Sequence, residues 1–142
     1  MKIFYLLGFI ILSSMNAHAE DDAPVSIKNG KKFIAVNNLP DGAKCKETSE
    51  FKLSGKIIGH RFGDDNLRLE EIIVDSSEGN RELIKVDLDD VERDWGVAGI
   101  AEVVPALQAI AKVGQKINAT IYKSGPSCAT KDIIYLKNIK LI

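Results

Sequence analysis

The sequence predicts a mainly β fold: a small barrel of five strands, with one helix between the third and fourth strands. Five stretches show the short apolar alternation of β-strands, and one longer stretch has apolar residues spaced by threes and fours. The helical stretch falls after the third strand-like stretch. The chain has 142 residues, of which 45% are hydrophobic and 27% charged, which is the composition of one globular domain.

Residues 1–19 predict a signal peptide for export. Lys2 gives a short basic start, an apolar run follows, and Ala17-His18-Ala19 is an A-x-A cleavage pattern. The run is shorter than the ~20 residues that cross a bilayer, and no later segment is apolar and long enough to do so. We therefore expect a periplasmic or secreted chain that begins at Glu20. The full sequence has a net charge of −1, which gives no long-range attraction to nucleic acid or to anionic membranes.

Cys45 and Cys128 both remain after that cleavage. An even number of cysteines in an oxidising compartment predicts a disulfide. Free buried thiols and a metal pair are the alternatives, although His60, the only remaining histidine, leaves too few partners for zinc. The spacing is unlike a redox C-x-x-C, so we expect a structural bridge.

The chain after the signal peptide divides into two parts. Residues 20–50 are a polar N-terminal arm in which only residues 32–36 resemble a strand, and residues 51–142 are the barrel domain. The barrel strands are expected at residues 51–62, 67–75, 81–88, 116–123 and 132–141.

Two features within these elements are informative. In the first barrel strand the apolar positions change parity at Gly59, which predicts a β-bulge. The helix is expected over residues 97–113, with Gly114 at its end. Pro105 predicts either a kink or two short helices that meet near Val104.

This order of elements resembles the OB-fold, a five-stranded Greek-key barrel. Leu53-Ser54-Gly55-Lys56-Ile57 is similar to the L-x-G-x-V opening of many OB domains, and the stretch from Val113 to Ile121 resembles the start of their fourth strand. The chain is similar to the broad group of exported bacterial proteins with anticodon-binding-like OB domains. That resemblance implies a fold and no particular activity.

The chain also resembles the receptor-binding B subunits of AB5 toxins in topology. Those proteins are exported OB-folds in which a disulfide joins a segment before the first strand to a position near the last strands. Cys45 and Cys128 are placed in the same way. This second resemblance implies a secreted oligomer that binds a receptor.

Secreted thermonuclease-like enzymes are OB-folds whose catalytic residues have a superficial counterpart here, at Gly63-Asp64-Asp65, Arg68, Asp75 and Glu78. That family places its first acidic pair and its arginine on different strands, whereas Arg68 follows Asp64 on one predicted hairpin. No arginine after Arg93 could supply the second cation that a phosphodiesterase needs. Because His60 also lacks a nucleophile and an orienting acid, we expect no enzymatic activity and no cofactor.

An acidic run precedes the expected helix, at Asp87, Asp89, Asp90, Glu92 and Asp94. A calcium loop would need an acid at Val91 and a glycine at Glu92, so we expect no metal site. The run is better explained as a solvated loop whose acids favour the helix N-terminus. We also expect no nucleic-acid partner, because the few aromatic residues are needed in the core rather than for base stacking.

In OB-folds the second and third strands commonly bind the ligand, together with the loops that join strands one to two and four to five. This resemblance implies a candidate ligand face at Arg68, Glu70 and Lys85 on the strands and at Asp64, Asp65, Ser124 and Lys131 on the loops. A solvated sheet without a ligand would show the same pattern.

We therefore expect a non-enzymatic, exported binding or interaction module of the periplasm, whose partner is a protein or a small ligand. The alternative is a secreted receptor-binding oligomer of the toxin B-subunit type. A monomer in solution would favour the first reading and a ring-sized mass the second.

Overall fold

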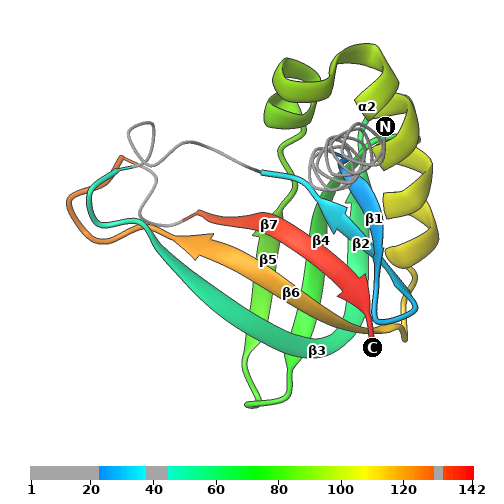
Figure 1. The fold of residues 1–142 in the computed structure, drawn as a ribbon. Helices are drawn as coiled ribbons and strands as arrows, with labels where there is room; N and C mark the ends of the chain where they lie inside the picture. Colours follow the sequence, from blue (N-terminus) through cyan, green and yellow to red (C-terminus); the bar gives the residue numbers. More distant parts are fainter. Residues whose placement is uncertain (1–22, 38–44, 130–132) are drawn as a thin grey trace, which may run out of the picture.

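The computed structural model describes residues 23–37, 45–129 and 133–142. These residues form seven strands and one helix (Figure 1): β1 (Val25–Lys28), β2 (Lys31–Ala35), β3 (Ser49–Phe62), β4 (Leu69–Ser76), β5 (Arg81–Lys85), α2 (Asp89–Ile110), β6 (Lys116–Lys123) and β7 (Ile134–Leu141). The strand expected over residues 32–36 is present as β2, and all five expected barrel strands are present as β3 to β7.

Five of these strands close into a barrel. The order is β7-β5-β4-β3-β6, and β6 pairs again with β7 to complete the ring. All neighbours are antiparallel except β5 and β7, which are parallel. The helix connects β5 to β6, the third and fourth barrel strands, so the predicted fold class is confirmed.

The segment that precedes the barrel contributes a hairpin to the same sheet. β1 pairs with β2 across the turn at Asn29 and Gly30, both of which have positive φ. Asn-Gly is the preferred sequence for this kind of two-residue turn. β2 then pairs with β7, and this pairing buries Ile34, whose relative exposure is 1%.

β3 is long because it serves two neighbours. Its first half pairs with β6 and its second half with β4, with Gly55 and Lys56 paired to both. The register with β4 shifts between Ile57 and Gly59, so the predicted bulge is confirmed. At Gly55 an added Cβ would lie against the backbone of Asp75, which explains why this crowded bend carries no side chain.

The helix differs from the prediction in its start and in the position of its break. It begins at Asp89, and its one non-helical residue is Gly96, with φ 66° and ψ −157°. The predicted junction of two short helices near Val104 is therefore wrong. Gly96 adopts a conformation that is open to glycine alone. Pro105 lies within the helix, and both Pro105 and Ala101, whose carbonyl loses its usual backbone partner to the proline, are exposed.

The core fills the barrel and the space beneath the helix, which runs beside β1, β2 and β4 (Figure 1). Its largest fully buried side chains are mostly isoleucines and leucines: Ile34, Ile57, Leu69, Ile72, Ile84, Leu107, Ile117, Ile121, Leu136 and Ile139. β-Branched side chains suit these strands because their preferred rotamers pack well on a pleated surface.

Cys45 and Cys128 form the predicted disulfide, with their Cα atoms 5.9 Å apart. The bridge joins the segment before β3 to the loop after β6. Those two strands pair next to it, from Ser49 opposite Lys123 onward. The bridge thus ties β3 and β6 together at the end of their pairing.

Candidate functional site

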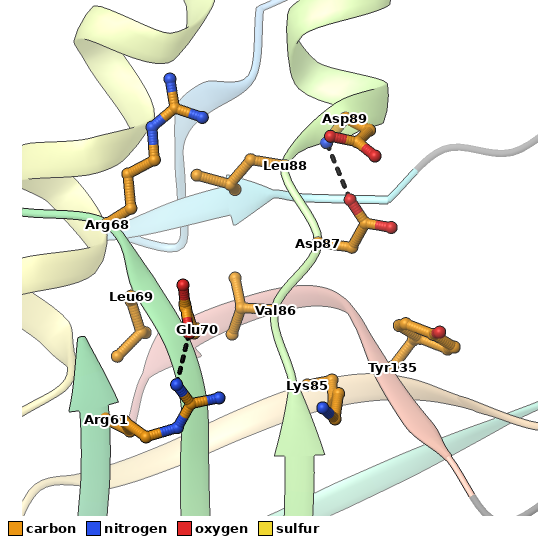
Figure 2. Close-up of a pocket in the computed structure, with 10 residues that line it drawn as sticks. All are labelled: Arg61, Arg68, Leu69, Glu70, Lys85, Val86, Asp87, Leu88, Asp89 and Tyr135. Carbon is orange, nitrogen blue, oxygen red and sulfur yellow. Dashed lines mark hydrogen bonds and ion pairs between the residues drawn. The ribbon is translucent and has the colours of Figure 1, made fainter. Parts of the chain in front are cut away.

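A depression of about 390 Å³ lies where β4 and β5 approach the first residues of β7 (Figure 2). It is lined by Arg61, Arg68, Leu69, Glu70, Lys85, Val86, Asp87, Leu88, Asp89 and Tyr135. Three residues of the predicted ligand face, Arg68, Glu70 and Lys85, are therefore brought together. A hollow of this size is within the range of small-ligand sites.

A network of charged side chains forms one side of this depression. The Arg61 guanidinium donates to Glu70 at 2.5 Å and to both carboxylate oxygens of Glu71 at 3.0 and 3.3 Å. Lys85 Nζ lies 3.4 Å from Glu71 Oε1. The hydrogen bonds from Arg61, followed by the ion pair with Lys85, lower the pKa of Glu71. Glu71 is therefore ionised at neutral pH and holds both cations in place.

Arg68 stands apart from this network. Among the described residues its side chain has no ion pair or hydrogen bond, and it is exposed. In Figure 2 its guanidinium points away from the Arg61–Glu70 pair and lies across the view from Asp87 and Asp89. Arg68 can therefore meet a ligand without first breaking a hydrogen bond or an ion pair, and Asp65 is the carboxylate that attracts it electrostatically.

The opposite rim of the hollow carries carboxylates and an aromatic ring. Asp87 accepts a hydrogen bond from the backbone N–H of Asp89 at 2.9 Å, which orders the chain as it enters α2. Tyr135 lies beside Lys85, because these two residues are paired in the parallel register of β5 and β7. The site thus offers an exposed arginine on one rim, and acids and a ring on the other.

Arg61 and Tyr135 were not predicted as site residues. Arg61 is on β3, at the register shift opposite β4, and its position depends on that irregularity. Tyr135 depends on a parallel pairing between strands that are far apart in the chain. Because neither contact is local, no sequence pattern signals either residue.

The predicted loop residues lie elsewhere. Asp64 and Asp65 do not line the hollow. Asp65 accepts the backbone N–H groups of Leu67 and Arg68, at 2.9 and 3.2 Å, and these bonds lower its pKa. Asp65 is therefore a turn-forming residue that also orders the backbone of Arg68.

Ser124, in the second predicted loop, does not line the hollow. Ser124 Oγ lies 3.3 Å from Thr48 Oγ1, next to the disulfide. Lys131 lies outside the described residues, so its place in the predicted ligand face stays a prediction.

The other residues singled out in the sequence do not form a site together. His60 is exposed and contacts the ring of Phe62 edge-on, with 5.0 Å between ring centroids. Across the described ranges, no group of three or more His, Cys, Asp or Glu side chains is placed to hold a metal ion. No helix in this part of the chain has the length and apolar character to span a membrane.

No protein-family model, no curated protein and no solved structure matches this chain. The described chain is a small β-barrel of five strands with one helix. Any statement about its function must therefore come from its own residues.

Proposed function

We propose that this protein is an exported, non-enzymatic binding module that holds its ligand in the depression formed by β4, β5 and β7. The observation that supports this proposal is that Arg68, Glu70 and Lys85 line one hollow. Among the described residues, the Arg68 guanidinium has no hydrogen bond or ion pair. β4 and β5 are the second and third barrel strands, which form the usual ligand face of OB-folds.

The charges suggest what the ligand presents. Arg68 is a planar donor with several N–H groups, so it suits a carboxylate or a phosphate better than a neutral group. The ring of Tyr135 can cover an adjacent apolar part. Asp87 and Asp89 disfavour a second anionic group on the far rim. We therefore propose a small ligand, or a peptide segment, with one anionic group.

Export and the lack of enzymatic activity rest on separate observations. The disulfide is consistent with the oxidising compartment that the signal peptide predicts. The carboxylate pair Glu70 and Glu71 is engaged by Arg61 and Lys85, so neither is a poised general acid or base.

The test uses ¹⁵N-labelled protein and a set of small carboxylates and phosphates. Binding at this site shifts the amide signals near Arg68, Lys85 and Tyr135, and Arg68→Ala weakens binding about tenfold, the loss of one charge-assisted hydrogen bond. Arg81→Ala is the control, because Arg81 is an exposed arginine at the start of β5, paired with Asp75.

Two outcomes contradict the proposal. Amide shifts confined to other strands would move the site, and a chemically altered compound recovered after incubation would make the protein an enzyme. Sedimentation of the same sample addresses the alternative, because a ring-sized mass would favour the receptor-binding oligomer over a monomeric module.

A further inference from the structure

The charge of this protein is strongly segregated, which its net charge conceals. β1, β2, β6 and β7 contain seven lysines and no acidic residue. The stretch from residue 63 to 113, which includes β4, β5 and α2, contains thirteen acidic and five basic residues. One side of the barrel is therefore basic and the other acidic.

Strand register places four of these lysines and two lysines of β3 on one outer face. Ile34, Ile117 and Ile139 point into the core, so their neighbours on β2, β6 and β7 point outward. Through the pairings of these strands with β1 and β3, the outward set extends over five adjacent strands (Figure 1). We call this surface the lysine face, defined by Lys28, Lys31, Lys52, Lys56, Lys116 and Lys140.

Two lysine pairs on this face lie directly opposite one another. Lys28 is opposite Lys31, and Lys56 is opposite Lys116. Like charges in such positions destabilise a sheet. In the part of the chain that the structure describes, none of the six lysines forms an ion pair; Lys28 Nζ lies instead 4.2 Å from the centre of the Phe33 ring. Asp75 of β4 is opposite Lys56, but its carboxylate is paired with Arg81 at 3.2 Å.

Protection of an exposed strand edge explains only one of these pairs. Lysines on an edge strand prevent unwanted pairing with other chains, and β1 is such an edge. The pair Lys56 and Lys116, however, joins β3 to β6, which both have neighbours on either side. Repulsion within the sheet has no such structural benefit, so it points to an anionic ligand.

The same face contains a second depression, of about 360 Å³. Its lining includes polar groups that can bind sugar hydroxyls, an aromatic ring and two lysines: Ser54, Asn118, Thr120, Asn138, Phe33, Lys52 and Lys140. Register sets Phe33, Lys140, Asn118 and Ser54 in one row across four strands. Carboxamides donate and accept hydrogen bonds at once, which matches the two-way bonding of a hydroxyl group.

We propose that the lysine face binds a linear acidic polysaccharide, with its carboxylates on the lysines and its hydroxyls on the amides of Asn118 and Asn138. Lys31 precedes Phe33 by two residues on β2, and Lys116 precedes Asn118 by two residues on β6. Both lysine pairs therefore lie in the row next to that of Phe33 and Asn118. That row extends from β1 to β3, a distance of about 19 Å at the usual strand spacing, which suits a chain of several charged sugar units.

Other polyanions fit the face less well. Anionic bilayers are usually bound by lysines mixed with apolar anchors. One large exposed apolar side chain, Ile142, lies beside Lys116 in the row of the lysine pairs, but a single anchor is few for a bilayer. Others of the described residues lie elsewhere, such as Leu67 before β4, Leu83 on β5 and Val97 on α2. Single-stranded nucleic acid needs several stacking rings, and the lining of this depression has one, Phe33.

The experiment measures binding of polygalacturonate fragments at physiological salt. Lys56→Gln/Lys116→Gln removes the interior lysine pair, and we expect at least a tenfold weaker Kd, roughly 1.4 kcal/mol. The matched control is Lys32→Gln/Lys112→Gln, since Lys32 faces the other side of β2, near Glu102, and Lys112 follows the helix. We expect this control to bind within about twofold of the unaltered protein, because distant exposed charges are screened.

A second pair of measurements separates recognition from plain charge attraction. Asn138→Ala should weaken polygalacturonate binding several-fold, about one hydrogen bond, and leave binding of dextran sulfate unchanged. The melting temperature of the Lys56→Gln/Lys116→Gln variant should stay the same or rise, because the repulsion is removed. A fall in affinity therefore cannot come from unfolding.

Several results would overturn the proposal. These are no binding of polygalacturonate, equal losses in the test and control variants, or no effect of Asn138→Ala. Tighter binding to vesicles of phosphatidylcholine and phosphatidylglycerol, or to single-stranded DNA, would also overturn it and identify the face as a membrane or nucleic-acid surface.

Discussion

Removal of the disulfide should cost this protein a large part of its stability. The Cys45–Cys128 bridge spans 83 positions. In the chain-entropy description, closing a loop of that length removes about 15 cal/mol/K from the unfolded state, which is about 4.5 kcal/mol at 25 °C. A small domain has a total stability of roughly 5–15 kcal/mol, so the Cys45→Ala/Cys128→Ala variant should melt about 15 °C lower.

The assay is thermal unfolding followed by circular dichroism, with three samples. The unaltered protein under oxidising conditions is compared with the same protein reduced and with the double alanine variant. Because the reduced protein keeps both sulfur atoms, any difference between it and the variant measures the packing of Cys128, which is 5% exposed. If the reduced protein melts within about 3 °C of the oxidised one, the loop-closure reasoning is refuted, because the unfolded chain would then already hold these ends together.

Three further predictions concern the bend of β3, the helix break and the charged network. Gly55→Ala places a Cβ against the backbone of Asp75, so chemical denaturation should show a loss of about 1–3 kcal/mol; an unchanged midpoint contradicts the crowding argument. Gly96→Ala forces alanine into a conformation with φ 66° and should cost roughly 1–3 kcal/mol, unless the two helical segments rejoin, which a rise in ellipticity would reveal. The pKa of Glu71 is lowered from 4.5 chiefly by Arg61, so its stabilising effect is present above pH 4.5 and lost as pH falls through the lower folded value. Glu71→Gln should therefore melt below the unaltered protein at pH 7, and the two melting temperatures should converge as pH falls below 4.5.

The elements of the barrel could be predicted from local sequence patterns. Alternation of apolar residues is a property of each strand by itself, so it located β3 to β7. The change of parity at Gly59 also indicated the bulge, because an extra residue reverses which side chains face the core. The hairpin of β1 and β2 was not predicted, because only residues 32–36 of this segment were expected to form a strand; the Asn-Gly turn that joins the two strands is a local feature of the sequence.

The helix break illustrates a limit of such local reasoning. Pro105 and Gly96 both disfavour a helix, and sequence rules rank proline as the stronger breaker. The structure breaks at Gly96 because the chain leaves β5 in one direction and must cross the barrel in another. That change of direction requires a positive φ, and only the packing around the helix decides where it falls.

Sequence patterns predicted the barrel, the single helix and the disulfide, and the resemblance to the OB-fold implied three of the residues that line the hollow. Tertiary structure alone decided that Tyr135 faces Lys85, that Asp65 and Ser124 lie away from the hollow, and that six lysines share one face. The physical reason is that strand identity is encoded in short-range alternation, whereas a site is formed by the register of strands distant in the chain. Register follows from the packing of the whole core, to which every strand contributes at once.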